Sequence, residues 1–300
     1  MPDPQLAVTS NVTDVALVFE GGGMRASYSS GVLSALLEGE VFCDWVGGIS
    51  AGTTCLANYL SRDSARAKRS FTDFALEPEF GGVGTFLRGK GLFNAEWIYE
   101  HTSEPDQALP FDWETFWANP AGCGIGAVRC EDGEMVYWGR SEVAEPLDLM
   151  RRVRASSTMP ILMPWTVIDG VAYADGALGP TGGFAIDAAQ AAGYRRFIVI
   201  TTRERGYRKP KLSRPKAVRA LMHRYPAVAQ GLIDRPANYN RSLDELHALE
   251  AEGRAFLLFP EQMPIGNNER DIAKLEAMYA QGLAQGRAAL PAIREFCGLG

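Results

Sequence analysis

Apolar runs and segments of helical periodicity alternate in the first part of the chain. Val15–Phe19 is an unbroken apolar run, as expected of a strand buried on both faces of a parallel sheet. Residues 26–37 then place apolar side chains at helical spacing, and the pattern repeats as a short strand over 43–47 and a helix over 53–60. This βαβα pattern predicts an α/β fold with a mostly parallel central sheet.

Two hairpins are predicted in the middle of the chain. Residues 127–138 and 165–173 each contain two strand-like runs, separated by turns at Asp132-Gly133 and Asp169-Gly170. The other predicted elements are a polar helix over 62–69, a short helix over 147–154, a helix over 184–192, a strand over 196–201 and a buried strand over 256–259.

The segment Gly48-Ile49-Ser50-Ala51-Gly52 stands between a predicted strand and a predicted helix, and it fits the G-x-S-x-G pattern of a nucleophile elbow. Glycine is needed on either side of the serine because the turn is sharp. A Cβ atom at Gly48 or Gly52 would collide with the crossing backbone. The alternative is an ordinary glycine-rich turn with an idle serine, which the strand–turn–helix context disfavours. We therefore predict that Ser50 is a hydroxyl nucleophile.

Three consecutive glycines, Gly21–Gly23, follow the first predicted strand and precede the first predicted helix. Successive glycine N–H groups at a helix N-terminus form a positively polarised pocket for anions. A nucleotide phosphate could occupy such a pocket. However, the run lacks the G-x-G-x-x-G spacing of dinucleotide sites, and no Gly-Lys-Ser/Thr follows as in a P-loop. An oxyanion hole is favoured because a candidate nucleophile lies one βα unit away.

A serine hydroxyl is a poor nucleophile near neutral pH, so it needs a base within hydrogen-bond reach. The chain has three histidines, His101, His223 and His247, and none lies in a strand-end loop of the kind that usually presents a catalytic histidine. Asp175 is a better candidate, because it follows the second strand of a predicted hairpin, where a loop can direct a carboxylate towards a site. From spacing alone, a turn aspartate without a catalytic role is equally consistent with this position.

Three of these segments resemble the signatures of the patatin-like phospholipases. They are Gly21-Gly22-Gly23-Met24-Arg25, Gly48-Ile49-Ser50-Ala51-Gly52 and Asp175-Gly176-Ala177, in the order found in that family. Ala155–Pro160 is similar to the family's Ala-Ser-x-x-x-Pro segment. Further segments look like the late strand, its loop and the C-terminal helices of a bacterial subgroup: 198–203, 206–209, 268–271 and 278–282. The resemblance covers the chain from Asp14 to about Gly286 and implies a three-layer α/β/α patatin-like fold.

The resemblance implies a Ser–Asp dyad without histidine, in which Ser50 is the nucleophile and Asp175 its general base. Gly21–Gly23 would supply the amides of the oxyanion hole, and Arg25 would support the hole electrostatically or structurally. The family often has glycine after this arginine, whereas this chain has Ala26, and we expect only a minor effect on the join between loop and helix. The implied activity is hydrolysis of a phospholipid or another acyl ester through an acyl-serine intermediate, without a cofactor or metal.

Two further segments suggest contacts with a substrate or a membrane. Residues 80–120 are rich in glycine and aromatic residues with weak periodicity, so they could form a lid or acyl-pocket wall, or fill a thin part of the core. Residues 203–219 are strongly basic. That run could meet an anionic membrane or phospholipid headgroups, or it could be a solvated helix face.

The composition agrees with a globular enzyme. Three hundred residues with 46% hydrophobic content can bury a substantial core, and the net charge of −6 argues against general nucleic-acid binding. The five cysteines show neither C-x-x-C nor zinc-type spacing, which favours reduced thiols and a cytoplasmic location. The N-terminus lacks an apolar core of signal-peptide length, and no apolar run approaches the ~18 residues of a membrane span. A peripheral contact is the membrane association that remains compatible.

We expect residues 1–13 to be a loose N-terminal tail, 14–286 to form the acyl hydrolase domain, and 287–300 to be a C-terminal helix or tail. Two alternative functions stay open. A conventional α/β-hydrolase with a Ser-His-acid triad would need a histidine late in the chain, and His247 has the only suitable position. A catalytically idle lipid-binding protein is disfavoured because all three parts of a site are present.

Overall fold

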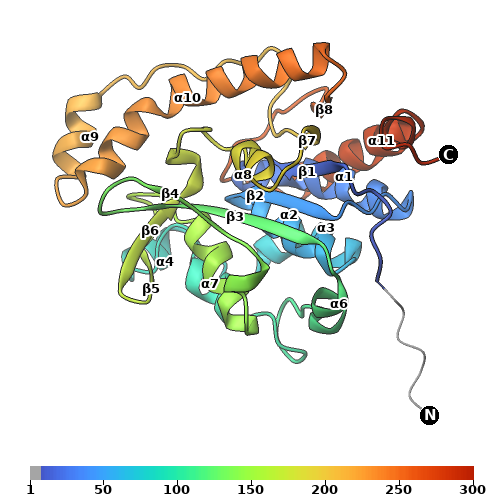
Figure 1. The fold of residues 1–300 in the computed structure, drawn as a ribbon. Helices are drawn as coiled ribbons and strands as arrows, with labels where there is room; N and C mark the ends of the chain where they lie inside the picture. Colours follow the sequence, from blue (N-terminus) through green and yellow to red (C-terminus); the bar gives the residue numbers. More distant parts are fainter. Residues whose placement is uncertain (1–7) are drawn as a thin grey trace.

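Eight strands form one sheet with helices on both faces in the computed structural model, which describes residues 8–300 (Figure 1). The strands are β1 (Val15–Phe19), β2 (Trp45–Ile49), β3 (Gly122–Arg129), β4 (Met135–Trp138), β5 (Thr166–Ile168), β6 (Val171–Asp175), β7 (Arg196–Ile200) and β8 (Ala255–Leu258). The α-helices are α1 (Ala26–Glu38), α2 (Ala51–Leu60), α3 (Ser64–Ser70), α4 (Val83–Leu87), α5 (Ala95–Glu100), α6 (Trp113–Ala118), α7 (Pro146–Ser156), α8 (Ile186–Ala191), α9 (Pro215–Leu221), α10 (Pro226–Ala251) and α11 (Ile272–Phe296). Short 3-10 turns occupy Gly23–Arg25, Asp73–Leu76, Arg140–Glu142 and Gly176–Leu178.

The central strands are parallel, as the sequence predicts. β3, β2, β1, β7 and β8 lie side by side in that order, and each neighbouring pair is parallel. β4, β5 and β6 add to the β3 end of the sheet in antiparallel fashion. The α/β class with a mostly parallel sheet is therefore confirmed. In such sheets the carboxyl ends of the parallel strands form one edge, and ligands bind there.

Alternate side chains of β1 enter two separate cores. Val15, Leu17 and Phe19 pack with α1, α2 and α11, whereas Ala16 and Val18 pack with α8 and α10. Figure 1 shows α8 and α10 on one side of the sheet and α2, α3 and α7 on the other. A strand covered on both faces requires an apolar residue at every position, which explains the unbroken apolar run that predicts it.

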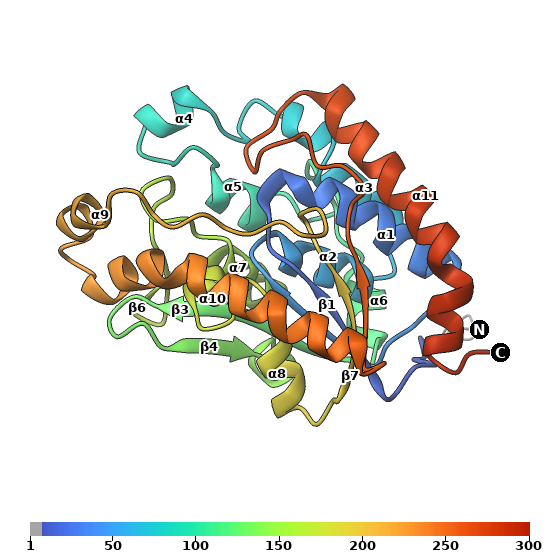
Figure 2. The same cartoon turned by 90° about the horizontal axis from the view of Figure 1, so that it is seen from above.

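The C-terminal helix α11 packs along α1 and belongs to the same body as the sheet (Figure 2). Two glycines permit the close approach of these helices. A Cβ atom on Gly31 would stand 2.2 Å from the carbonyl oxygen of Tyr279, and one on Gly282 would stand 2.0 Å from that of Tyr28. α11 continues without interruption through the boundary expected between residues 286 and 287.

The chain is already anchored to the sheet before β1. Val12 is 1% exposed and forms a parallel bridge with Cys43, and the amide of Asn11 donates to the carbonyl oxygen of Phe42 at 2.9 Å. Residues 8–13 are thus not the loose tail that the sequence suggested, because Val12 is part of the core. Residues 1–7 of the predicted tail lie outside the described residues.

The aromatic segment over residues 80–120 divides into two parts. Phe80 and Phe93 line an apolar pocket. Phe111 and Phe116 lie elsewhere in the core and pack against each other, with ring centroids 5.7 Å apart. Both predicted roles, pocket wall and core filler, therefore apply, each to a different part of the segment.

Candidate active site

Strands β2 and β6 meet head to head along one edge of β3. β2 runs parallel to β3, and its last residue, Ile49, lies opposite Gly126. β6 runs antiparallel to β3, and its last residue, Asp175, lies opposite Ala127. β4 occupies the other edge of β3. The carboxyl ends of β2 and β6 are consequently adjacent, and Ser50, which follows Ile49, lies beside Asp175.

Ser50 sits at the sharp turn between β2 and α2. Its backbone has φ 56° and ψ −130°, a conformation that residues other than glycine rarely adopt. A Cβ atom on Gly48 would be 2.4 Å from the carbonyl oxygen of Gly52, and one on Gly52 would be 2.3 Å from that of Phe19. Neither glycine of the G-x-S-x-G segment can therefore carry a side chain. The turn has the strand–turn–helix geometry of a nucleophile elbow.

Hydrogen bonds hold this strained turn against β3. The amide of Ser50 donates to Oγ of Ser156 at 2.9 Å, and the Ser156 hydroxyl donates to the carbonyl oxygen of Gly126. The Ser50 carbonyl oxygen accepts from the amide of Thr53 at 2.8 Å and from its hydroxyl at 2.6 Å. A Cβ atom on Gly176 would lie 2.4 Å from the same Gly126 carbonyl oxygen, so this position also requires glycine.

The Asp175 carboxyl is 6% exposed, and burial raises its pKa above the ordinary value for aspartate. The positive charges of Arg235 and Lys209 oppose this increase. So do the amide of Ala177, which donates to Oδ1 at 2.9 Å, and the nearby hydroxyl of Ser50. The carboxyl thus lies beside the hydroxyl that it would have to activate.

The glycine loop before α1 has two unoccupied amides. The amide of Gly21 already donates to the carbonyl oxygen of Gly183 at 3.3 Å. The amides of Gly22 and Gly23 donate to no acceptor among residues 8–300. Gly23 has φ +56°, and a Cβ atom on it would stand 2.3 Å from the carbonyl oxygen of Asn267. Of the three amides that the sequence assigns to an oxyanion hole, two are therefore available and that of Gly21 is engaged.

Arg25 lies buried behind this loop, as expected for a supporting residue. It is 6% exposed, and its Nε donates to the carbonyl oxygen of Thr202 at 3.1 Å. Burial lowers its pKa to about 10, the charge of Arg203 adds to the decrease, and the charge of Glu20 opposes it. Glu20 is 2% exposed and accepts from the amide of Thr202 at 2.6 Å. These contacts tie the loop to the end of β7.

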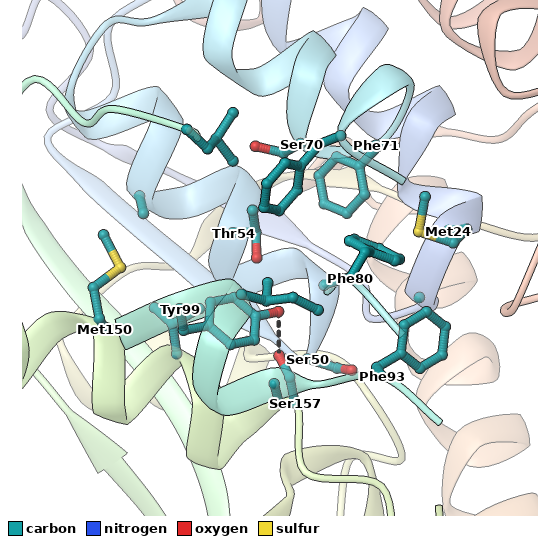
Figure 3. A pocket seen from close by; sticks show the side chains of 18 of the residues that line it. Met24, Ser50, Thr54, Ser70, Phe71, Phe80, Phe93, Tyr99, Met150 and Ser157 are labelled. Carbon is teal, nitrogen blue, oxygen red and sulfur yellow. Dashed lines mark hydrogen bonds between the residues drawn. The ribbon is translucent and has the colours of Figure 1, made fainter. Parts of the chain in front are cut away.

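An apolar pocket lies beside Ser50 (Figure 3). Ser50, Thr54 and Ala57 recur at helical spacing and present one face of α2 and its N-terminus to the pocket. The hydroxyl of Tyr99 donates to Oγ of Ser157 at 3.3 Å, and both residues line the pocket near Ser50. The rest of the wall is mostly aromatic and thioether side chains: Met24, Phe71, Phe74, Phe80, Phe93, Met150, Met159 and Met163. Such a lining suits a hydrocarbon chain.

The three histidines lie away from Ser50. His101 lines a separate pocket, and His223 is exposed just after α9. His247 stacks on the ring of Phe259, and its Nδ1 lies 3.3 Å from a carboxylate oxygen of Glu250. No histidine lines the pocket beside Ser50 or alters the pKa of Asp175. Within residues 8–300, no group of three or more His, Cys, Asp or Glu residues is arranged to hold a metal ion.

Ser156, Asn267 and Arg235 position or influence the site, although no sequence pattern assigned them a role. Ser156 fixes the elbow, and the carbonyl oxygen of Asn267 accepts from the amide of Met24 at 3.0 Å. Ser156 lies in the Ala-Ser-x-x-x-Pro segment, which was an available signal. Asn267 and Arg235 lie far along the chain, where no motif indicated a contact with the glycine loop or the dyad.

Comparisons with known proteins connect this geometry to a family. A family model described as patatin-like phospholipase matches residues 17–185, and one described as a domain of unknown function, DUF6363, matches residues 225–298. The uncharacterized protein YjjU of Escherichia coli (strain K12) is 26% identical over 192 residues, which are 63% of this chain and 52% of that protein. The chain thus spans about half the length of this curated relative. The crystal structure of VipD from Legionella pneumophila aligns with 93% of this chain and 67% of its own, with a TM-score of 0.48 and 11% identity.

Proposed function

Because the chain belongs to the patatin-like phospholipase family, a family of lipid acyl hydrolases, we propose that it is a serine acyl hydrolase with Ser50 as nucleophile and Asp175 as general base. One observation carries the proposal. The meeting of β2 and β6 on β3 brings a strained serine and a buried carboxyl together beside an apolar pocket. The substrate is an acyl ester whose chain enters that pocket, either in a phospholipid or in a smaller ester.

Acylation of Ser50 is the first chemical step. Asp175 accepts the proton of the Ser50 hydroxyl while the serine oxygen attacks the ester carbonyl carbon. The resulting oxyanion accepts hydrogen bonds from the amides of Gly22 and Gly23, and loss of one such donor typically costs about 3–4 kcal/mol. The bond to the alcohol then breaks, Asp175 returns its proton to the departing alkoxide, and Ser50 remains acylated.

Deacylation uses the same groups with water as the attacking molecule. Asp175 removes a proton from water, and the water oxygen attacks the acyl carbon of the intermediate. The second tetrahedral oxyanion uses the same two amides. When the bond to Ser50 breaks, the proton on Asp175 passes to the serine oxygen, and the carboxylic acid product leaves.

Asp175 can act without a histidine because of its surroundings. An exposed aspartate has a pKa near 3.9 and is a weak base. Burial raises the pKa of Asp175, which improves its match to a working pH near neutrality. The closeness of the Ser50 hydroxyl to the carboxyl supports this role, whereas no histidine affects the pKa of Asp175.

Peripheral contact with a lipid surface is supported by α4. This helix lies between Phe80 and Phe93, which both line the pocket, and it projects from the body of the molecule (Figure 2). Its exposed apolar side chains are Val83, Phe86 and Leu87. The basic residues Arg88 and Lys90 follow them and share one acidic partner, Glu79, which leaves a net positive charge. An apolar tip with adjacent cations suits shallow insertion into an anionic bilayer surface.

A cytoplasmic location is supported by the cysteines. All five are free and buried, and burial raises the pKa of the Cys55 thiol, which disfavours the reactive thiolate. Among residues 8–300, no helix combines the length and apolar character needed to cross a bilayer.

The proposal is tested with p-nitrophenyl esters of increasing chain length and with phospholipids, on the wild-type protein and on Ser50→Ala. We expect hydrolysis by the wild type and a loss of several powers of ten in the variant, as is usual when a serine nucleophile is removed. Ser141→Ala, on the surface, is the matched control and should keep full activity. Absence of hydrolysis by the wild type on every ester, with lipid binding retained, would favour the idle lipid-binding protein.

A further inference from the structure

The cations that follow β7 divide into two groups. Arg205 donates two hydrogen bonds to Glu250 at 2.7 and 2.8 Å, and Arg208 donates two to Asp244 at 2.6 and 2.9 Å. Both acids lie on α10, and both pairs are exposed to solvent. The basic run predicted from the sequence is therefore not one uniform face, because part of it is neutralised by α10.

A second group, formed by Arg203, Lys209 and Arg235 and here called the cationic cluster, has no such partners. Within residues 8–300, these three side chains form no ion pair and no hydrogen bond, although all are partly buried. The Nε atoms of Arg203 and Arg235 are shielded from solvent without an acceptor. Unsatisfied donors on charged groups are costly to bury, so a bound anion would stabilise this arrangement.

Two tyrosines fix the cationic cluster in place. The guanidinium of Arg203 lies 4.5 Å from the ring centroid of Tyr207, and Nζ of Lys209 lies 4.4 Å from that of Tyr239. Arg235 precedes Tyr239 by one helical turn on α10, so both face the same way. Arg203 and Lys209 are thus held by aromatic rings, and these contacts leave their donors available to an incoming group.

The cationic cluster lies close to the glycine loop and is richer in basic than in acidic groups. Arg203 follows Thr202, whose hydroxyl donates to the carbonyl oxygen of Gly21 at 3.0 Å. Lys209 lies over the ring of Tyr239, which packs on Phe184 with ring centroids 5.4 Å apart. Arg235 and Lys209 are also the two charged groups that lower the pKa of Asp175, and burial lowers the pKa of Lys209 itself to about 7. Glu20 is already engaged by a backbone amide.

We infer that the cationic cluster binds the phosphate group of a phospholipid substrate while the acyl chain occupies the apolar pocket. The inference rests on the proposed acyl hydrolase function. A phosphodiester offers several anionic oxygens, which guanidinium groups bind bidentately and an ammonium binds as a point charge. All three cations lie beyond residue 185, where the patatin-like match ends, and Arg235 lies in the segment of unknown function over 225–298. That segment would then contribute Arg235 to headgroup recognition, while Arg203 and Lys209 come from the loop before it.

The test compares two lipids with the same acyl chains, of which only one carries a phosphodiester headgroup. Phosphatidylglycerol and diacylglycerol with the same acyl chains are presented in the same neutral detergent micelles, and the ratio of their kcat/KM values is measured. Arg203→Gln should lower this ratio roughly 10- to 100-fold, as expected for the loss of a charged hydrogen bond. Arg203 is the best first choice because it is not among the groups that shift the pKa of Asp175.

Arg208→Gln is the matched control, because it removes the same charge from the same loop but belongs to an exposed pair with Asp244. We expect it to leave the ratio unchanged. The diacylglycerol rate reports any damage to the fold or to the dyad, since it does not involve the phosphate. A ratio that stays within about twofold of wild type in both Arg203→Gln and Lys209→Gln would overturn the inference in an active enzyme.

Binding without chemistry separates the possible sources of phosphate. Calorimetry on Ser50→Ala should detect sn-glycerol 3-phosphate, and Ser50→Ala/Arg203→Gln should bind it at least tenfold more weakly. Tighter binding of inorganic phosphate than of glycerol 3-phosphate, with an unchanged lipid ratio, would assign the cluster to free phosphate and overturn the headgroup assignment. If the wild type hydrolyses neither lipid, the calorimetry alone decides the inference, and the proposed function fails only if the p-nitrophenyl esters are not hydrolysed either. Binding that depends on Arg203 would still support a phosphate site, and no binding would overturn it.

Discussion

The two faces of the sheet place chemically different side chains near Ser50 and Asp175, apolar ones on one face and basic ones on the other. On the α2 side, the pocket is lined by aromatic and methionine side chains, all from residues within the 17–185 family match. On the α10 side, Arg203, Lys209 and Arg235 form no ion pair with any residue from 8 to 300, and all come from later in the chain. A substrate with an apolar end and an anionic end fits this division. The proposed headgroup preference would then depend on residues that follow the 17–185 match.

The two sides would contribute to substrate binding by different physical means. Each methylene group of the acyl chain that is buried in the pocket contributes about 0.8 kcal/mol to the binding free energy, because its apolar surface is removed from water. Contacts between cations and a phosphate depend on charge, and salt weakens them where they are exposed. Substitutions can therefore weaken binding by the apolar pocket or by the cationic cluster separately. A substitution at the junction of the two sides, that is at Ser50 or Asp175, should lower hydrolysis of every substrate.

The largest loss of hydrolysis is expected for a substitution of Asp175, at the junction of the two sides. Asp175→Asn keeps the shape of the side chain but cannot accept the serine proton, so hydrolysis of charged and neutral lipids should fall together by several powers of ten. His101→Ala, His223→Ala and His247→Ala should each retain most activity, because none of these residues lines the pocket. Rates are measured beside circular dichroism spectra to exclude unfolding. An active Asp175→Asn with an inactive His247→Ala would establish the Ser-His-acid triad instead.

Substitutions in the glycine loop should lower the hydrolysis of charged and neutral lipids equally, but by a smaller factor than Asp175→Asn does. In Gly22→Ala the new Cβ would stand 2.6 Å from Oγ1 of Thr202, and in Gly23→Ala it would stand 2.3 Å from a carbonyl oxygen at a positive φ. Displacement of either amide should lower kcat roughly 100- to 1000-fold. Gly139→Ala is the control, because its Cβ would meet nothing closer than 3.5 Å. Near-normal rates in folded Gly22→Ala and Gly23→Ala would make the loop structural, which would return weight to a nucleotide site.

Ala57→Leu should weaken binding of the acyl chain in the apolar pocket without changing recognition of the headgroup. Ala57 is 3% exposed and faces the pocket two turns after Ser50 on α2, so a larger side chain would fill space that an acyl chain uses. Displacing about two methylenes should lower kcat/KM for p-nitrophenyl decanoate about tenfold relative to the acetate. The ratio for phosphatidylglycerol and diacylglycerol should not change. Ala65→Leu, at an exposed position on α3, should alter neither ratio. An equal loss on acetate and decanoate would remove the pocket from its acyl-binding role.

Arg235→Gln, a substitution in the cationic cluster, should change the pKa of the proposed base, Asp175. The charge of Arg235 lowers the pKa of Asp175, so its removal should raise that pKa further. The base acts in its deprotonated form, and the acidic limb of kcat/KM on a neutral ester should therefore move to higher pH. Arg205→Gln, which loses an exposed pair with Glu250, should leave the limb in place. A limb that moves to lower pH in Arg235→Gln would contradict the charge arrangement around Asp175.

The central α/β unit could be predicted from the sequence because its signals are local. Val15–Phe19 is apolar throughout, and Gly48-Ile49-Ser50-Ala51-Gly52 lies between a strand and a helix in both sequence and structure. The turn at Ser50 depends on its immediate neighbours, and these neighbours are adjacent in the chain. The same locality explains why Asp175 could be placed at the end of a hairpin.

Other parts of the site depend on contacts between distant segments and could not be predicted. The register that sets Ile49 and Asp175 opposite neighbouring residues of β3 is a property of the assembled sheet. The basic loop gave no sign of which cations are paired, because their partners lie on α10, some 40 residues later. The uninterrupted course of α11 through residue 286 also depends on distant contacts. Gly282 permits close packing of α11 against α1, which lies some 250 residues earlier in the chain.

The central claim is that Ser50 becomes covalently acylated at the junction of the two sides. The most direct measurement is incubation of the folded protein with a fluorophosphonate probe, followed by intact mass spectrometry and mapping of the modified peptide. The account predicts a single adduct on Ser50, slower labelling in Asp175→Asn and no adduct in Ser50→Ala. An adduct on any other residue, or equal labelling of Ser50→Ala, would contradict it.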